Sequence, residues 1–296
     1  MGKSQTAHEH LTRFGLTDRA PQMPRTIAEV RQFWEKNPLW AGESAFEAGS
    51  REFFEEHARV VVEDGFAGRI DERIFPRQPA IGPVLDLGCG PGFWTIELAR
   101  RGFQVTAADL TERALELARQ RCSVFGVSAR FCLQNAERMS FPDASFAHVN
   151  CQGVIHHTPD TEACVAEIAR VLKPGGTASI SVYYRNVFLR AWPALRPVGG
   201  LITRLGAGLK GRGREDIFAQ REVSEIVRLY DGLQNPIGKC YSRGAFLRLV
   251  QPFFRLRETF LHFFPARALP VRIPPALHRF LDRHAGFLIY ASLTRD

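Results

Sequence analysis

The sequence lacks several features that would place it in a special class of protein. It contains no run of about twenty apolar residues, the length that a helix needs to cross a bilayer. Its first thirty residues carry charge and proline throughout and lack the apolar core of a signal peptide. Its six cysteines form no CxxC pair, which favours reduced, mostly buried thiols over disulfides or zinc ligands. Together these absences predict a cytoplasmic protein.

Acidic residues are missing from one stretch of the last third, between Arg185 and Arg214. The net charge of the chain is +8, and its arginines are concentrated in this last third. A basic surface suits an anionic substrate, an anionic membrane face or nucleic acid, and it also suits solubility alone. The basic residues follow no recognisable RNA-binding motif, so we expect no nucleic-acid partner. The sequence does not specify an oligomeric state.

The hydrophobic content of 45% in 296 residues is enough for a sizeable core. From residue 84 to residue 184, short apolar segments alternate with segments of helical periodicity. Predicted helices begin near residues 93, 111 and 160, and the predicted strands are 84–87, 104–108, 129–133, 146–153 and 177–184. This alternation is typical of an α/β fold with a doubly wound parallel sheet, whose ligand lies at the carboxyl ends of the strands.

The flanking segments break this pattern. Residues 1–79, with their aromatic cluster, predict a helical N-terminal cap on the core of residues 80–184. Residues 185–245 are basic, apolar and rich in glycine, and we expect them to form an inserted lid over the site. Residues 246–296 contain two further predicted strands, 254–264 and 286–294, which would complete the core sheet.

A glycine-rich segment, VLDLGCGPGFWT from Val84 to Thr95, carries the strongest functional signal. Glycine allows the backbone to turn sharply and to approach a ligand without a Cβ in the way. A predicted strand precedes this segment, a predicted helix follows it, and Asp109 ends the next strand. This arrangement indicates a nucleoside cofactor, with the carboxylate accepting hydrogen bonds from the ribose hydroxyls. The spacing GCGPG differs from the GxGxxG of dinucleotide enzymes, which argues against a nicotinamide oxidoreductase.

These features resemble the class I S-adenosylmethionine-dependent methyltransferases, and most closely the branch that contains ubiquinone and menaquinone C-methyltransferases. The resemblance covers residues 84–184 and rests on DLGCGPG, Asp109, NAERMSFPDASF, GVIHHTPD and RVLKPGG. It implies a Rossmann-like fold with a seven-stranded sheet. It also implies S-adenosylmethionine as cofactor, S-adenosylhomocysteine as product, and a small-molecule substrate.

The resemblance also implies roles for single residues. Asp109 would hold the ribose and Leu110 would lie against the adenine. Gln152 would contact the amino-acid end of the cofactor through its backbone, and Asp86 would be oriented towards the amino group. The loop under the methionine part would comprise Gly88, Cys89, Gly90 and Gly92. The adenine edge would be lined by Asn135, where the family more often has aspartate, and by Ala136 and Glu137.

The adjacent histidines His156 and His157 follow the fourth predicted strand. In an extended segment neighbouring side chains point to opposite sides, so we expect one of the two to face the pocket. That histidine either lines the pocket or acts as a general base. A two-histidine metal site is not expected, because no carboxylate or third histidine lies at ligand spacing.

Aromatic and basic residues elsewhere are further candidates for the acceptor pocket. Tyr183 and Tyr184 end the fifth predicted strand, and one of them should face the pocket, with Tyr183 a candidate catalytic residue. Residues that would close over the substrate, unless they belong to the core, are Trp34, Tyr230, Tyr241 and Arg243.

Methyl transfer from a sulfonium is an in-line displacement, which needs close alignment above all. The sequence predicts transfer to oxygen, nitrogen or carbon of a small apolar or anionic metabolite. Two alternatives remain open. One is a protein that binds S-adenosylmethionine without catalysis or with a different reaction. The other is a lipid or quinone methyltransferase that makes peripheral contact with the inner membrane face through the basic, apolar segment.

Overall fold

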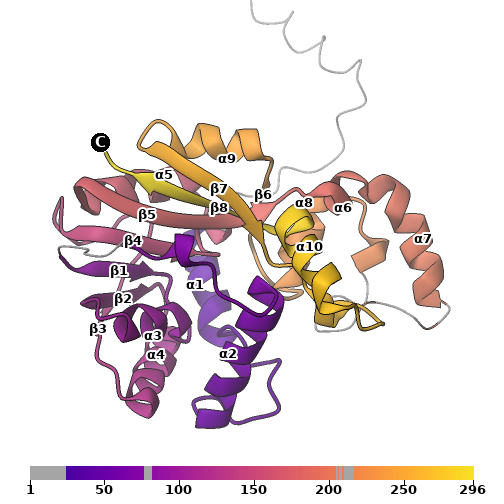
Figure 1. Cartoon of the computed structure of the whole chain (residues 1–296), viewed down its shortest axis with the longest axis horizontal. Coiled ribbons are helices and arrows are strands. Elements are labelled where there is room, and N and C mark those ends of the chain that lie inside the picture. Colours follow the sequence, from indigo (N-terminus) through magenta and orange to yellow (C-terminus); the bar gives the residue numbers. More distant parts are fainter. Residues whose placement is uncertain (1–24, 77–81, 205, 207–208, 210–216) are drawn as a thin grey trace, which may run out of the picture.

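The computed structural model describes residues 25–76, 82–204, 206, 209 and 217–296. Within these residues eight strands form one sheet with the order β3-β2-β1-β4-β5-β8-β7, and the short β6 pairs with β5 (Figure 1). The strands are β1 (Val84–Leu87), β2 (Val105–Asp109), β3 (Arg130–Leu133), β4 (Phe146–Gln152), β5 (Leu172–Tyr184), β6 (Cys240–Tyr241), β7 (Arg255–His262) and β8 (Leu288–Thr294).

Five strands, β1 to β5, run parallel, and β8 lies antiparallel between β5 and β7. The register pairs Asp86 of β1 with Ala107 of β2 on one side and with Asn150 of β4 on the other. The carboxyl ends of these three strands therefore meet at one edge of the sheet. This edge is where a doubly wound sheet binds its ligand.

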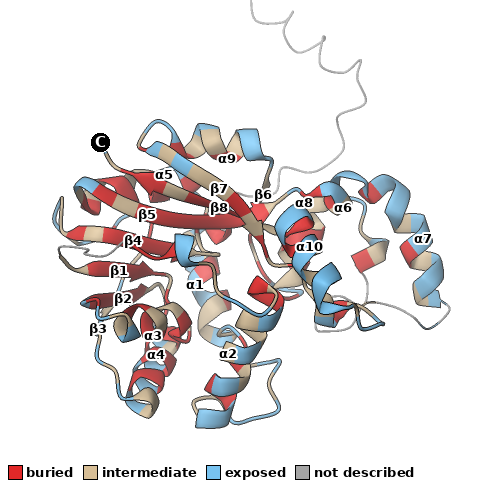
Figure 2. Cartoon of the chain, in the orientation of Figure 1, coloured by how far each residue is buried: buried red, intermediate tan, exposed pale blue. Residues whose placement is uncertain are grey.

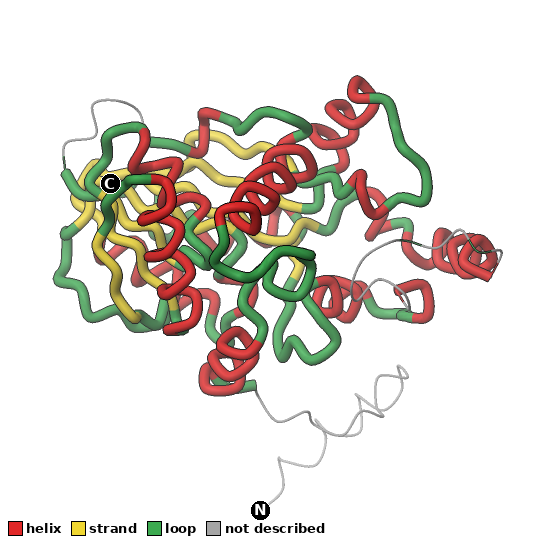
Figure 3. Tube along the Cα trace, turned by 90° about the horizontal axis from the view of Figure 1, so that it is seen from below, coloured by secondary structure: helices red, strands yellow, loops and turns green. Residues whose placement is uncertain are grey.

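Helices cover both faces of the sheet, as Figure 3 shows from below. Val84 of β1 packs in a cluster with Leu98 of α3 (Phe93–Arg100), on the face that also carries α4 (Glu112–Phe125). Leu85 and Leu87 point to the other face, into the main core beneath α5 (Thr161–Val171) and α9 (Arg243–Val250). Alternate residues of a buried parallel strand thus serve two separate hydrophobic cores.

The predicted strands and the α/β architecture are confirmed, with local differences. Strand β5 begins at Leu172, five residues before the predicted start at 177. Its early part pairs with β4 through Leu172 and Phe146, and Arg295 exchanges backbone hydrogen bonds with Gly175 and Gly176. The two-residue β6 and helix α10 (Pro275–Ala285) were not predicted. The remaining seven strands form the continuous path that was expected.

The N-terminal region packs beside the carboxyl edge of the sheet through α1 (Ile27–Lys36) and α2 (Arg51–Phe66). Thr26 and Glu29 form a capping box that starts α1. Phe53 and Phe54 of α2 are fully buried in a cluster with Leu117 of α4. A short 3₁₀ turn, η2 (Glu72–Ile74), leads towards the sheet. The predicted cap also includes residues 1–24 and 77–79, which lie outside the described residues.

The segment after β5 contains α6 (Val187–Arg190), α7 (Trp192–Arg204), a 3₁₀ turn η4 (Ile217–Ala219) and α8 (Val223–Tyr230). Helix α7 projects away from the sheet, and Figure 2 shows its outer side exposed. The sequence of 215–230 also predicts a helix; the structure has a 3₁₀ turn followed by α8 there, and residues 215 and 216 lie outside the described part. No helix in the described residues is both long and apolar enough to cross a membrane.

Candidate active site

A cavity of about 340 Å³ opens at the carboxyl edge of the sheet, between the strand ends and the N-terminal helices. Helix α2 presents one face to it, through His57, Val60, Val61, Asp64 and Gly65. This spacing of three and four residues is that of a single helical stripe. From the sheet, the cavity is lined by residues at the ends of β1, β2, β4 and β5. The N-terminal helices therefore form a wall of the site as well as a cap on the fold.

The three glycines of the loop after β1 have positive φ angles, between +50° and +78°. A Cβ on Gly88 would lie 2.3 Å from Val154 Cγ2, and one on Gly92 would lie 3.0 Å from Ala118 Cα. Gly90 differs, because a Cβ there would meet no described atom within 4 Å and the residue lines the cavity. Two of the glycines thus permit close packing, and the third leaves space for a ligand.

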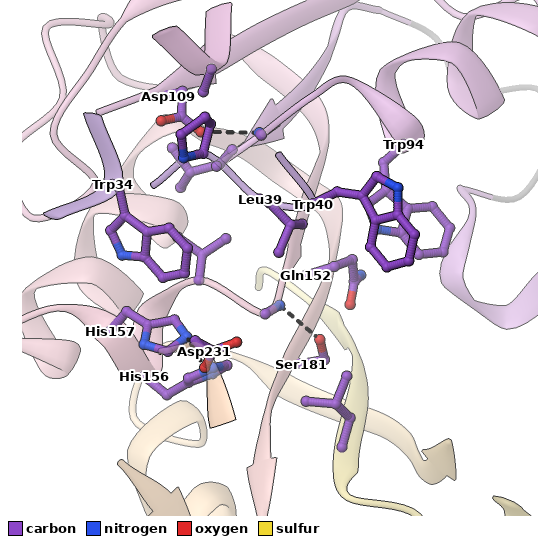
Figure 4. Close-up of a pocket in the computed structure, with 18 of the residues that line it drawn as sticks. Trp34, Leu39, Trp40, Trp94, Asp109, Gln152, His156, His157, Ser181 and Asp231 are labelled. Atoms are coloured by element: carbon purple, nitrogen blue, oxygen red, sulfur yellow. Dashed lines mark hydrogen bonds and ion pairs between the residues drawn. The ribbon is translucent and has the colours of Figure 1, made fainter. Parts of the chain in front are cut away.

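Asp109, at the end of β2, fastens this loop to the neighbouring strand (Figure 4). Its Oδ2 accepts a hydrogen bond from the Gly90 backbone N–H at 3.0 Å. Its Oδ1 accepts from the Thr111 backbone N–H and hydroxyl, both at 3.0 Å. Burial raises the pKa of Asp109, and these hydrogen bonds oppose that effect. The carboxylate lines the cavity together with Leu110.

Asp86 of β1 lies beneath the loop and is outside the cavity lining. It accepts hydrogen bonds from Thr95 Oγ1 at 2.6 Å and from Asn150 Nδ2 at 2.8 Å. Burial raises its pKa to about 6. Asp86 therefore ties β1 to α3 and β4 and supports the glycine loop from below.

The two histidines both line the cavity, so the expectation that they point to opposite sides is wrong. Their segment is a 3₁₀ turn, η3 (Ile155–His157), which follows Gly153 at φ +73°, and is not an extended strand. The turn brings the two rings to a centroid distance of 4.2 Å. Burial holds the pKa of His156 well below its usual value, and its Nδ1 is buried with no hydrogen-bond partner.

His157 belongs to a polar cluster with Asp231 and Tyr183. Its Nδ1 lies 2.8 Å from the carbonyl oxygen of Ile237. A carbonyl only accepts, so Nδ1 carries a proton, and Nε2 is the ring nitrogen at which a further proton can be gained or lost. That Nε2 lies 3.4 Å from Asp231 Oδ2, and the Tyr183 hydroxyl donates to the same carboxylate at 2.9 Å. Figure 4 shows His157 and Asp231 on the side of the cavity that Trp34 also borders.

The chain is also similar in sequence to known methyltransferases. A family model described as a methyltransferase domain matches residues 84–176. The ubiquinone biosynthesis O-methyltransferase of Azoarcus sp. (strain BH72) is 36% identical over 175 residues, which cover 54% of this chain and 71% of that protein. The chain belongs to the family of S-adenosylmethionine-dependent methyltransferases.

Further relatives match over shorter segments. The ubiquinone biosynthesis O-methyltransferase of Xanthomonas axonopodis pv. citri (strain 306) is 38% identical over 110 residues, or 37% of this chain. This chain spans about half the length of such relatives, 46% for that protein and 59% for the one from Idiomarina loihiensis. A methyltransferase structure from Methanosarcina mazei has a TM-score of 0.54 at 19% identity and covers 76% of this chain and 98% of that one. This similarity supports the fold.

The cofactor of the family, S-adenosylmethionine, fits the donors and acceptors of the cavity. Gln152 donates through Nε2 to Asn150 Oδ1 at 2.9 Å and to Ser179 Oγ at 2.8 Å. Its Oε1 is buried without a partner, and the residue lines the cavity. Such an acceptor suits the ammonium group of the amino-acid tail. The resemblance predicts this contact through the backbone of Gln152, whereas the structure offers the side chain.

Residues predicted for the adenine edge divide into two groups. Asn135 and Ala136 line the cavity. Asn135 Oδ1 accepts from the Glu137 backbone N–H at 3.0 Å, so this oxygen is already engaged in a local turn. Glu137 lies outside the lining and accepts from the Asp160 backbone N–H at 2.7 Å, where it supports the start of α5. Cys89 is likewise outside the lining and packs against Leu115 and Ala118.

The predicted acceptor residues also divide. Trp34, Tyr183 and Tyr230 line the cavity. Tyr184, Tyr241 and Arg243 do not, and for these three the prediction needs correction.

Strand alternation turns Tyr184 away from Tyr183, and its hydroxyl accepts from Arg190. The Tyr241 hydroxyl donates a hydrogen bond to Thr161 of α5. Arg243 begins α9, which packs on the same face of the sheet as α5. Among the described residues of 185–245, the cavity lining includes Tyr230 and Asp231, with none from α6 or α7.

Sequence reasoning missed several residues of the cavity wall, above all His57, Trp40 and Asp231. Asp231 lies in YDGLQNP, a stretch that loosely resembles other members of the family and could have drawn attention to it. His57 and Trp40 lie in the N-terminal region, where no motif marks them. Only the packing of α2 and the preceding loop against the sheet edge brings them to the site.

Proposed function

We propose that this chain transfers the methyl group of S-adenosylmethionine to a hydroxyl oxygen of a small, mainly apolar, aromatic acceptor. The observation that supports this most is the cluster of His157, Asp231 and Tyr183 in the wall of the cavity that also contains Asp109. The named relatives are O-methyltransferases of ubiquinone biosynthesis, which favours an oxygen on a ring. The wall near the cluster is rich in aromatic side chains, including Trp34 and Tyr230.

The residues around the glycine loop would hold the cofactor, which supplies an activated methyl group. Gly90 leaves room for the cofactor, Asp109 would accept hydrogen bonds from its ribose hydroxyls, and Gln152 Oε1 would accept one from its ammonium group. Alignment of the acceptor with the methyl group is the main requirement of such a transfer, worth up to about 7–11 kcal/mol in favourable cases. The rigid strand ends and the stripe on α2 provide that alignment.

An attacking hydroxyl must lose its proton, and His157 with Asp231 can receive it. A proton on Nε2 of His157 would lie beside Asp231, while Nδ1–H keeps its hydrogen bond to Ile237. Both N–H groups of the resulting imidazolium are then stabilised. The neighbouring His156 stays neutral, because burial holds its pKa well below its usual value, and it adds no opposing charge.

The test is methyl transfer from radiolabelled S-adenosylmethionine to a matched panel of catechol, aniline and indole, each with and without an isoprenoid side chain. The proposal predicts labelled ethers from the phenols, at higher rates for the substituted ones. Label that appears on nitrogen or carbon acceptors and not on the phenols would refute the oxygen assignment. Label on no member of the panel, with binding of S-adenosylhomocysteine retained, would favour a non-catalytic binder.

We further propose that α7 rests on an anionic membrane surface when the acceptor is a lipid. Its outer side exposes Leu195, Val198, Leu201 and Ile202, which are between 37% and 59% exposed. This spacing forms one apolar stripe, and Arg196 and Arg204 lie on the same helix with no acidic residue nearby in the sequence.

Flotation with phosphatidylglycerol vesicles tests this contact. The wild-type chain should float, and Leu201→Glu should stay at the bottom of the gradient. Leu233→Glu, at a leucine outside α7 that is more exposed than Leu201, is the control and should float. A wild-type chain that stays at the bottom removes this proposal and leaves the methyl transfer untouched.

A further inference from the structure

Arg121 of α4 is a buried cation, and the groups that accept hydrogen bonds from its guanidinium are all uncharged. It is 2% exposed, and its guanidinium donates to His57 Nδ1 at 2.9 Å, to the Phe54 carbonyl at 3.0 Å and to the Pro91 carbonyl at 3.3 Å. Its Nε is buried without a partner. A buried charge is costly unless it is paired or hydrogen-bonded, and here hydrogen bonds satisfy it only in part. Pro91 belongs to the glycine loop, so this charge lies directly behind the cofactor side of the site.

Arg121 also fixes the chemical form of His57. A guanidinium can only donate, so Nδ1 of His57 accepts and Nε2 carries the proton. Burial and the charge of Arg121 both hold the pKa of His57 well below its usual value, so the ring is neutral. His57 lines the cavity, and no described residue hydrogen-bonds its Nε2–H. The ring therefore offers the cavity a fixed hydrogen-bond donor.

Trp40 offers a second donor beside the first. Its indole Nε1–H is buried with no partner, its ring centroid lies 5.8 Å from that of His57, and it lines the cavity. Its φ angle of +74° is unusual for a bulky residue and is held by the surrounding contacts. In Figure 4 Trp40 lies on the opposite side of the view from His156 and His157.

The carboxylates in this part of the wall are already paired. Arg267 lies over the Trp40 ring at 4.8 Å, and it forms ion pairs with Asp64 at 2.7 Å and with Glu43 at 2.9 Å. Arg267 thus pairs with both carboxylates, and neither of them pairs with Arg121. The region that Trp40 and His57 border thus has two donors, and behind them lies a guanidinium whose hydrogen-bond partners among the described residues are all uncharged.

We propose that His57 and Trp40 form a subsite that binds a carboxylate, with Arg121 as the cation behind His57. The inference rests on the proposed function only in taking this cavity as the ligand site. A carboxylate can come from the amino-acid tail of the cofactor or from the methyl acceptor. Both N–H groups donate to its oxygens, and the charge of Arg121 strengthens the donor of His57. The sequence predicts an anionic ligand from the basic segment after β5. The proposed subsite lies elsewhere, on buried residues of the N-terminal wall.

Calorimetry with two cofactor analogues distinguishes the sources. S-adenosylhomocysteine has the amino-acid tail, and 5′-methylthioadenosine lacks it. If the subsite binds the tail, His57→Phe and Trp40→Phe should each weaken binding of S-adenosylhomocysteine by about tenfold or more, with binding of methylthioadenosine changed less than about twofold. If the subsite binds the acceptor, both nucleosides should bind as they do to the wild type. Benzoate should then bind more weakly to the variants saturated with S-adenosylhomocysteine than to the saturated wild type, whereas the affinity for benzyl alcohol should not change.

Trp192→Phe is the matched control, because Trp192 Nε1 donates to the Gln220 carbonyl at 2.8 Å outside the cavity. With ¹⁵N-labelled tryptophan the chain has four indole signals, and that of Trp40 should move downfield when the carboxylate binds while that of Trp192 stays. Thermal melts confirm that each variant is folded. Equal losses for both nucleosides, or wild-type affinity for S-adenosylhomocysteine and benzoate in both variants, would overturn the subsite. Methyl transfer by the wild-type chain is measured separately, so the two proposals fail separately.

Discussion

At the scale of the residue, the part of the site that could be predicted from the sequence is the part that neighbours in the chain build. Gly88, Gly90 and Asp109 are marked by their spacing on a strand, a turn and the next strand. Their local geometry follows from backbone sterics, because the loop needs positive φ angles. His57 and Asp231 could not be predicted in this way. They are 174 positions apart and meet at the cavity only through tertiary packing.

Asp109→Asn should weaken binding of S-adenosylhomocysteine by about tenfold or more. The amide can accept with one oxygen only, and it lacks the charge that strengthens hydrogen bonds to the ribose hydroxyls. Calorimetric titration measures the change. Asp143→Asn, at an exposed carboxylate outside the cavity, should bind as the wild type does. Equal affinities for Asp109→Asn and the wild type would remove Asp109 from the cofactor site.

His157→Gln should lower kcat by about 10²–10⁴-fold on a phenolic acceptor, because the proton acceptor is lost. The amide can still donate to the Ile237 carbonyl, so the turn should be preserved. Affinity for S-adenosylhomocysteine should not change, since the proposed cofactor contacts are Gly90, Asp109 and Gln152. The matched control is His284→Gln, at the exposed end of α10. Full turnover by the variant would assign His157 to architecture and leave proton transfer to another group.

At the scale of the element, the sequence predicts strands and helices well where one periodicity applies, and less well where contacts decide. The His156–His157 segment has no periodicity of its own, and Gly153 lets it form a 3₁₀ turn instead of an extended end to β4. The early start of β5 depends on backbone pairing with Arg295, more than a hundred residues away. Such pairings leave no local signal, so the boundary was predicted late.

Gly92→Ala should destabilise the packing of α3 on α4 by more than backbone strain alone. A positive φ costs alanine about 1–2 kcal/mol, and overpacking typically adds about 1–3 kcal/mol. Gly102→Ala is the matched control, because its φ is +84° and its Cβ would meet no described atom within 4 Å. Chemical denaturation should show the larger loss for Gly92→Ala. Equal losses would mean that Ala118 gives way without cost.

His148 of β4 should make the sheet sensitive to acid. Burial lowers its pKa from 6.5 to about 3, with a smaller contribution from Arg257. The folded state thus binds the proton less readily than the unfolded state, so its contribution is complete above pH 6.5 and is lost as the pH falls towards 3. The loss is ~1.4 kcal/mol per pH unit, or ~3 kcal/mol at pH 4.5.

His148→Asn keeps a partner for Thr177 Oγ1, which lies 2.7 Å from His148 Nδ1, and removes the titration. The difference between wild-type and variant free energies of unfolding should therefore change between pH 7 and pH 4.5, in favour of the variant at low pH. Urea denaturation at several pH values measures it. Parallel curves over this range would show that His148 titrates alike in both states.

At the scale of the whole molecule, the α/β order of elements predicted the sheet and the edge at which the site lies. The sequence did not predict how the N-terminal helices would close that edge. Their stripe on α2 reads as an ordinary amphipathic pattern, and only the structure shows that it lines a cavity rather than a solid core. The same holds for α7, which is expected over the site: Trp192 at its start is buried, whereas Leu195, Val198, Leu201 and Ile202 are exposed.

The central claim is that the edge between the glycine loop and α2 binds an S-adenosyl nucleoside. Titration of S-adenosylhomocysteine into the full wild-type chain, followed by calorimetry, tests it most directly. The account predicts saturable binding of one molecule per chain. A folded chain that gives no heat of binding at any temperature examined, and no shift of its thermal midpoint with the nucleoside, would contradict it.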